Sequence, residues 1–168
     1  MKHVSLLWKL LFLFLGLSVS LFVVLNTVGL NIMQKRMLAK TKEELYRNGT
    51  VYVAEYLLEY YEENLNYKEL SVQFELLSDM TNSRVWLVSN SGTIIMDSEK
   101  SAVGFSIMEK EDSFLEKTFQ ENVYFKGIMK EPMLCANVPV IHNYSNKGHL
   151  VLAMGMKAIE EESVYYLD

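Results

Sequence analysis

The feature that most constrains this chain is an uncharged, mainly apolar run of 25 residues, 10–34, bounded by Lys9 and Lys35. A helix rises about 1.5 Å per residue, so about 20 of these residues would cross the roughly 30 Å hydrocarbon core of a bilayer. We therefore predict a transmembrane helix over residues 10–34. The alternative is a signal peptide cleaved near Ser20. Cleavage there would leave a second apolar run at the new terminus, which favours an uncleaved anchor.

The charges divide just after this run. Residues 1–42 carry six Lys or Arg and no acid, whereas the rest of the chain carries 10 Lys or Arg against 21 acids, so the net charges are +6 and −11. This division favours a membrane segment followed by an acidic domain. It argues against nucleic acid as a partner, because a phosphate-binding surface needs clustered basic residues. Four of the first six basic residues follow the apolar run, so charge alone leaves the orientation open.

The residues that follow the apolar run contain no proline up to position 65, which predicts that the helix continues out of the membrane. Five apolar or aromatic residues, three or four positions apart, form a seam on one face of this helix. The seam consists of Val51, Ala54, Leu58, Tyr61 and Leu65. Two interpretations stay open, a homodimer interface that transmits motion or a contact with the chain's own sheet. Fewer than three heptads do not decide between them.

The remaining pattern predicts an α+β domain, in which the long helix packs on one antiparallel PAS-like sheet of about five strands. Asn66 is expected to cap a helix over residues 68–80. Five β-rich runs are expected to form the strands, with Asn90, Ser91 and Gly92 in the hairpin between the first two. These runs are residues 84–89, 93–98, 123–129, 132–141 and 149–156.

The segments between and after these strands complete the expected order. A loop over residues 104–112 and a short helix over residues 112–122, with Phe114, Leu115 and Phe119 facing inward, separate the second strand from the third. A polar turn over residues 142–148 joins the last two strands, and a final helix starts at residue 157. Pro139 has no N–H group, so the fourth strand should carry a bulge or an unpaired position there.

Two segments resemble extracytoplasmic PAS-like sensor domains, the single Cache or PDC domains. RVWLV at 84–88 and SGTIIMDS at 91–98 are similar to the first hairpin of that family. NVPV at 137–140 and GHLVL at 148–152 are similar to its last hairpin. The resemblance spans residues 10–168 and implies a location in the cell membrane. Residues 1–9 would be cytoplasmic and residues 35–156 extracytoplasmic, and residues 157–168 would begin a helix that returns to a second transmembrane segment.

The resemblance also implies a function. Such domains receive signals, and the parent protein is most often a two-component sensor histidine kinase, in which a stimulus moves helices across the membrane. The alternatives are the sensor domain of a chemoreceptor or a diguanylate cyclase, and a free-standing accessory or pilin-like protein. A pilin-like subunit is disfavoured because the first acid, Glu43, follows the apolar run instead of lying within it.

The residues offer no catalytic constellation. His3, His142 and His149 lie far apart in different segments, and the eight glycines form no phosphate-binding loop. A single cysteine, Cys135, supports neither an intrachain disulfide nor a cysteine-based zinc site. We expect no catalytic residue, cofactor or metal in this chain, and whether the parent protein is an enzyme depends on its output domain.

The resemblance implies that a small-molecule ligand lies against the sheet. Strand alternation places Arg84, Trp86 and Val88 on one face, so Arg84 and Trp86 are candidates for an anionic and aromatic lining. Lys126, Asn137 and His149 are candidate polar partners. The alternative interpretation is structural, with Trp86 in the core, Arg84 and Lys126 in solvent and His149 at the surface end of a strand.

Overall fold

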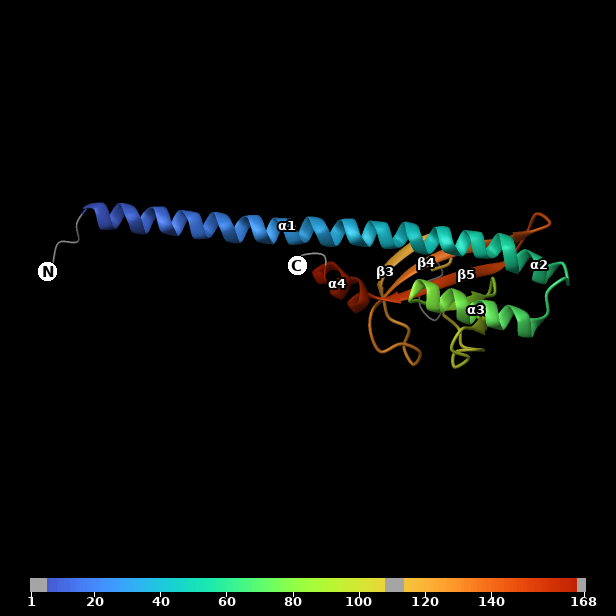
Figure 1. Ribbon diagram of the computed structural model, residues 1–168. Coiled ribbons are helices and arrows are strands. Elements are labelled where there is room, and N and C mark those ends of the chain that lie inside the picture. The colour runs from blue at the N-terminus through green and yellow to red at the C-terminus, as the bar shows by residue number, and fades with distance from the viewer. Residues whose placement is uncertain (1–5, 108–113, 166–168) are drawn as a thin grey trace. The chain divides into compact units, whose positions relative to one another are not determined.

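The computed structural model describes residues 6–107 and 114–165 (Figure 1). The helical elements are α1 (Leu6–Tyr52), the π-helical turn η1 (Val53–Leu57), α2 (Leu58–Tyr61), α3 (Tyr67–Thr81) and α4 (Met156–Tyr165). The strands are β1 (Arg84–Val88), β2 (Ile94–Asp97), β3 (Phe119–Val123), β4 (Met133–His142) and β5 (Ser145–Gly155). The expected α+β class is confirmed.

The chain divides into two units, residues 1–37 and residues 38–168. The first unit contains the apolar part of α1, which is long and apolar enough to cross a membrane. The apolar side chains described there are exposed, with Leu13 and Phe14 each at 71%. An apolar helix with its side chains uncovered on this scale is a candidate for the interior of a bilayer.

The second unit is built on a five-stranded antiparallel sheet with the strand order β2-β1-β5-β4-β3. β1 lies between β2 and β5, with Trp86 opposite Asp97 on one side and opposite Val151 on the other. Every residue of β1 is buried. A strand buried on both faces requires that each face of the sheet is covered.

The α1 residues beyond Met37 and α3 cover one face of this sheet (Figure 1). Tyr52 of α1 packs edge-on against Phe74 of α3, with ring centroids 5.5 Å apart. Gly49 lets α1 approach the strands closely, because a Cβ atom there would lie 2.9 Å from Leu152 Cδ1 and 2.9 Å from Val138 Cγ2. This face therefore holds a core shared by helices and sheet.

The long helix contacts its own sheet mainly through residues beside the seam, and Tyr61 and Leu65 at the end of the seam also pack against this core. Tyr52, Val53 and Leu57 are buried in this core. Within the seam, Val51 is 49% exposed and Ala54 is also exposed, whereas Leu58, Tyr61 and Leu65 are partly buried. The helix thus packs on the sheet while the start of the seam stays uncovered, and the homodimer interface stays a prediction.

Asn66 caps α3 as expected. Its Oδ1 accepts a hydrogen bond from the Glu69 backbone N–H at 3.0 Å, and Glu69 Oε2 accepts one from the Asn66 backbone N–H at 3.1 Å. This reciprocal pair satisfies two amide groups that the first helical turn leaves free. At the other end, Asn82 adopts a left-handed conformation (φ 46°) that ends the helix.

The expectations for residues 112–129 are wrong where the structure describes them. The expected helix over residues 112–122 begins outside the described residues, and its remainder contains a turn and β3. Phe114 packs with Trp86 and Phe125 on one side of the sheet, whereas Phe119 packs against Tyr46 on the side of α1. One short helix cannot place both rings there, so the chain instead passes around the sheet edge.

The expected strand over residues 123–129 is also wrong. β3 ends at Val123, and the backbone N–H groups of Ile128 and Met129 both donate to the Phe125 carbonyl in tight turns. Gly127 takes a positive φ of 86° there, a conformation that glycine adopts without strain.

The hairpin between β4 and β5 is tighter than the polar turn expected over residues 142–148. Only Asn143 and Tyr144 separate the strands, and both have positive φ angles, 50° and 58°. Pro139 lies just before a register shift between Val140 and Ile141, which confirms the expected irregularity. The Asn137 N–H points away from β5 and donates to the Thr118 carbonyl. Pro139 is two positions further along the strand, so an N–H group there would point to the same side, where the edge of β4 is uncovered.

Candidate functional site

Four of the five predicted ligand-binding residues share the face of the sheet opposite the helices. Trp86 lies across from Val151, and Val151 lies across from Asn137. Two positions along β5 from Val151, His149 lies across from Val88, and Arg84 is two positions before Trp86 on β1. Because residues paired across strands project to the same side, these four side chains lie on one face. Lys126 is apart from them, exposed in the turns after Phe125.

Trp86 is the centre of a second core on this face. Its side chain is fully buried, and the Phe125 ring packs edge-on against it at 4.8 Å between centroids. Phe114 packs edge-on against Phe125 at 5.6 Å. The segments between β2 and β3 and between β3 and β4 therefore cover the sheet with aromatic side chains, which agrees with the structural interpretation of Trp86.

Asp97 joins the first of these covering segments, between β2 and β3, to the sheet. Its Oδ1 atom accepts hydrogen bonds from Arg84 Nε (2.9 Å), Trp86 Nε1 (3.0 Å) and the Glu99 backbone N–H (3.2 Å). Its Oδ2 atom accepts from Arg84 Nη2 (2.6 Å) and the Ala102 backbone N–H (2.9 Å). Burial favours a raised pKa for Asp97, but these hydrogen bonds and the Arg84 charge hold the pKa below its ordinary value. The carboxylate is therefore ionised and fully hydrogen-bonded.

Arg84 is buried, not solvated as the structural interpretation expected, with only 6% of its surface exposed. Besides its two bonds to Asp97, the guanidinium contacts Glu99 Oε2 (2.8 Å), Ser101 Oγ (2.6 Å) and Met129 Sδ (3.7 Å). Four of the five guanidinium N–H groups thus have a hydrogen-bond acceptor within the protein, and Glu99 adds an ion pair. In this arrangement Arg84 orients Asp97 and stacks near Trp86, 5.6 Å from its ring.

Asn137 and His149 form a hydrogen-bonded pair. Asn137 Oδ1 lies 2.9 Å from His149 Nδ1, and Asn146 Nδ2 lies 3.2 Å from His149 Nε2. A carboxamide oxygen only accepts and its nitrogen only donates, so these contacts fit a neutral ring that carries its proton on Nδ1. Asn137 Nδ2 also donates to the Leu115 carbonyl at 2.7 Å. The pair therefore connects β4 and β5 to the covering segment.

Burial lowers the pKa of His149, because the half-buried site disfavours the charged ring. Protonation would also place a hydrogen on Nε2, where the ring now accepts from Asn146. The arrangement thus favours the neutral histidine. It also links protonation of His149, through Asn137, to the contact of β4 with the segment that contains Leu115.

An open hollow of about 830 Å³ lies at the Arg84 end of the same face. Its volume is within the range of small-molecule sites. Arg84, Met129, Met133 and Ala153 contribute to its wall, together with charged residues of α3, α4 and the neighbouring loops. Of the five predicted residues it includes Arg84 alone. Among the described residues, no group of three or more His, Cys, Asp or Glu side chains is arranged to hold a metal ion.

Sequence reasoning missed Asp97 and Asn146. Asp97 had a detectable signal, because an acid in a β-rich run beside predicted core residues needs a basic or N–H partner. Asn146 had none, because its role depends on the two-residue turn that brings it to His149.

Known sensor domains share this fold. The V. cholerae histidine kinase DctB sensor domain matches with a TM-score of 0.64 at 12% identity, covering 83% of this chain and 58% of that one. The sensory domain of the Campylobacter jejuni chemoreceptor Tlp3 with isoleucine bound matches with a TM-score of 0.57 at 12% identity, covering 80% and 59%. The E. coli DcuS sensor domain gives 0.53 at 12% identity, covering 75% and 98%.

The chain therefore has the fold of PDC-type sensor domains, as its two hairpins suggested, and it spans about three-fifths of the DctB and Tlp3 domains. No family model and no curated protein sequence matches it.

The lowered pKa of His149 makes the stability of the domain depend on pH. Below the ordinary histidine pKa of about 6.5, the unfolded chain binds a proton before the folded one does, so stability falls as the pH drops from about 6.5 toward the folded pKa. We expect His149→Gln to flatten this dependence, measured as the melting temperature of the full chain between pH 7.5 and pH 5. His142→Gln, in the exposed hairpin, is the control. If His149→Gln kept the pH dependence of the wild type, His149 would not be its cause.

Proposed function

We propose that the chain is the extracytoplasmic signal-input domain of a two-component sensor histidine kinase, anchored in the cell membrane by residues 10–34. The observation that carries the proposal is the sensor-domain fold joined, through one continuous helix, to a segment apolar enough to cross a membrane. Residues 1–9 are then cytoplasmic, residues 35–156 form the external domain, and residues 157–168 lead toward a second membrane segment.

In the proposed mechanism, the loop-covered face of the sheet receives the stimulus and the helix-covered face transmits it. The two faces share the same strands, and Trp86 and Leu87 project from β1 into opposite cores. A stimulus that repacks the covering segments would therefore change how the sheet packs on α1. Such a change requires two states whose free-energy difference the stimulus can shift.

A small-molecule ligand is part of this proposal. The Tlp3 sensory domain was solved with isoleucine bound. In the present chain we propose that a ligand lies against the face that carries Trp86, Asn137 and His149. Arg84 holds Asp97 and borders the hollow, and Lys126, exposed in the turns after Phe125, stays a proposed polar partner. The covering segment would have to open for this ligand, since Trp86 is fully buried.

The likeness to Tlp3 supports a second candidate, the sensor domain of a chemoreceptor. The two candidates share the input domain and differ in the output domain, so the residues described here serve both equally.

The membrane orientation can be tested with substituted cysteines in intact cells. Tyr144→Cys lies in the fully exposed β4–β5 hairpin and is expected to react with a membrane-impermeant maleimide. His3→Cys is expected to react only after the membrane is permeabilised. The native Cys135 provides little background, because it is fully buried and burial raises the pKa of its thiol. Labelling of His3→Cys but not Tyr144→Cys in intact cells would refute the orientation.

The proposed homodimer can be tested by oxidative crosslinking of the full chain in membranes. If the seam pairs two copies of the helix, Val51→Cys and Ala54→Cys should form disulfide-linked dimers, because both positions are exposed and belong to the seam. Glu59→Cys, exposed on the same helical segment but outside the seam, is the control. Crosslinking of Glu59→Cys alone, or of none of the three, would refute the interface.

A further inference from the structure

A chain of hydrogen bonds runs from the β4–β5 hairpin through His149 to the segment that covers the sheet. Asn146 Nδ2 lies 3.2 Å from His149 Nε2, and His149 Nδ1 lies 2.9 Å from Asn137 Oδ1. Asn137 Nδ2 in turn donates to the Leu115 carbonyl at 2.7 Å. In this row of four groups the imidazole alone titrates, and its neighbours are neutral.

Backbone groups fix the orientation of both carboxamides. The Gly148 N–H donates to Asn146 Oδ1 at 2.9 Å, which leaves Asn146 Nδ2 to face the ring. At the other end, the Leu115 carbonyl accepts from Asn137 Nδ2, which leaves Asn137 Oδ1 to face Nδ1 of the ring. Because a backbone N–H only donates and a carbonyl only accepts, neither amide can be turned round without losing its backbone bond.

The backbone that holds Asn146 is itself closely packed. Gly148 has a φ angle of 141°, and a Cβ atom there would collide with the Val88 carbonyl oxygen, so the hairpin lies directly against β1. Asn90 Nδ2 also donates to the Asn146 carbonyl at 2.8 Å. Asn146 therefore cannot move aside without breaking contacts with the turn that follows β1.

A protonated His149 does not fit this arrangement. The charged imidazole carries a hydrogen on both nitrogens, so its Nε2–H would face the N–H groups of Asn146. Turning the Asn146 amide to present its oxygen would break the bond from the Gly148 N–H. The charged ring therefore costs a hydrogen bond in either orientation of the amide.

No neighbouring charge compensates a proton on His149. The residues paired with it across the strands, Val88 and Pro139, are uncharged. Three charged residues adjoin the hydrogen-bonded groups in sequence, and all are exposed, namely Glu116, Lys117 and Lys147. Burial lowers the pKa of His149, and no charged group among the described residues is a cause of this shift. The half-buried ring is thus favoured only while it is neutral.

The Asn137 bond helps to hold residues 114–118 over the loop-covered core. Gln120 Nε2 also donates to the Phe114 carbonyl at 2.7 Å, so loss of the Asn137 bond loosens the segment without detaching it. Cys135 is two positions before Asn137 on β4, so its thiol lies on the same face, fully buried in this core. The reactivity of the thiol therefore measures how often the segment opens.

We propose that this domain senses acidification through His149. A protonated ring turns toward water, its Nδ1–H leaves Asn137, and the Asn137 amide no longer holds the Leu115 carbonyl. Residues 114–118 then open more often, so a proton acts as a signal at the face to which the proposed function assigns the input. The inference rests on that proposed function for its role in signalling, whereas the opening itself is a property of the folded chain.

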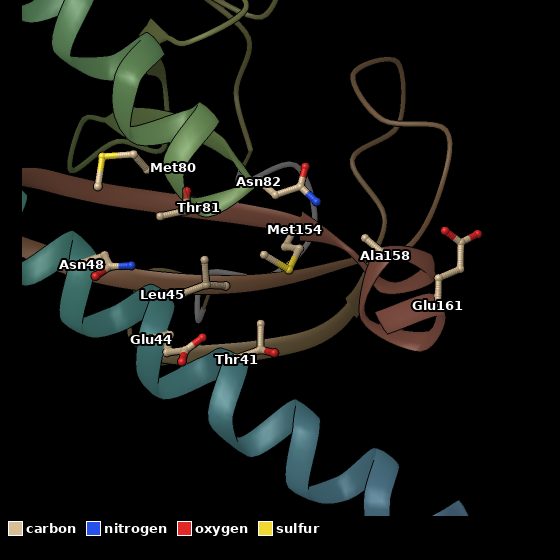
Figure 2. A pocket seen from close by; sticks show the side chains of 10 residues that line it. All are labelled: Thr41, Glu44, Leu45, Asn48, Met80, Thr81, Asn82, Met154, Ala158 and Glu161. Carbon is tan, nitrogen blue, oxygen red and sulfur yellow. The ribbon is translucent and has the colours of Figure 1, made fainter. Parts of the chain in front are cut away.

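The helix-covered side of the domain supplies a control. A pocket of about 470 Å³ there is lined in part by Glu44 of α1 and Glu161 of α4 (Figure 2). The Glu44 side chain is 46% exposed and Glu161 is exposed, and none of the hydrogen-bonded groups around His149 lines this pocket. Replacing both carboxylates, in Glu44→Gln with Glu161→Gln, should therefore leave the acid response as it is in the wild type.

The test measures how fast 4,4′-dithiodipyridine modifies Cys135, the single cysteine, in the full chain in detergent micelles. Each rate is divided by the rate for the urea-unfolded chain at the same pH, which removes the intrinsic pH dependence of the thiol. From pH 7.5 to pH 5.5 this ratio should rise about tenfold in the wild type, because pH 5.5 is about one unit below the ordinary histidine pKa of about 6.5. His149→Gln should show no rise, and His142→Gln, which removes the other described histidine, should rise as the wild type does.

Urea separates the local opening from global unfolding. A local opening exposes little surface, so 1 M urea should change the ratio at pH 5.5 by less than about twofold, whereas labelling through global unfolding would accelerate at least about fivefold.

Asn146→Asp separates proton sensing from a structural role. A carboxylate at position 146 accepts from the Gly148 N–H and also from a protonated Nε2–H, so it stabilises the charged ring. The ratio should then stay level or fall on acidification, whereas a weakened contact alone would raise it at both pH values.

The proposal is overturned if the wild-type ratio does not rise, or if His149→Gln or Asn146→Asp rises as much as the wild type. It is also overturned if the Glu44 and Glu161 double variant loses the rise, or if 1 M urea accelerates labelling at pH 5.5. These rates are measured without an output domain, so they do not depend on whether the parent protein is a sensor kinase.

Discussion

The structure of the domain depends on one buried carboxylate. Asp97 accepts five hydrogen bonds, from two side chains of β1 and from two backbone groups of the segment that follows β2. It thereby fixes the first hairpin, the position of Trp86 and the start of the covering segment at once. Removing one partner of a buried ion pair leaves the other charge without compensation, which makes such a group hard to replace.

The two cores give the two faces of the sheet different properties. On the helical face, α1 and α3 pack apolar residues against β1, β4 and β5 in one continuous core. On the other face, the short turns carry Phe114 and Phe125. Hydrogen bonds connect these turns to the strands, since Asn137 donates to the Leu115 carbonyl and Asp97 accepts from the Glu99 and Ala102 backbone N–H groups. Turns held by a few hydrogen bonds rearrange at lower cost than packed helices, so the loop-covered face suits an input and the helical face suits transmission.

Local patterns predicted local structure well. The alternation in β1 placed Arg84 and Trp86 on one face, and Asn66 began α3 where its capping preference indicated. The apolar positions of the long helix were less informative. The seam and the true sheet-facing residues Tyr52, Val53 and Leu57 are neighbours on the helix, and the π-helical turn at Val53–Leu57 changes the spacing. Only the position of the sheet decides which of these residues are buried.

The segment between β2 and β4 could not be predicted, because its conformation depends on contacts distant in sequence. Phe114 and Phe119 face opposite sides of the sheet, which no helical or strand period encodes. The partners of Arg84 and His149 were likewise set by strand register and by a tight turn. The sequence therefore predicted the face of the sheet on which four of the five candidate residues lie. It did not predict their hydrogen-bond partners, which depend on the folded chain.

We infer that Asp97, and not the acidic surroundings of Arg84 in general, organises this face. The free energy of unfolding of the full chain in detergent micelles, measured in urea through Trp86 fluorescence, tests it directly. Asp97→Asn should destabilise the domain by about 3–5 kcal/mol, since it leaves Arg84 buried without its main partner. Glu99→Gln, which removes the exposed partner of the same guanidinium, should cost about 1 kcal/mol or less. Equal losses of stability in the two variants would contradict this role of Asp97.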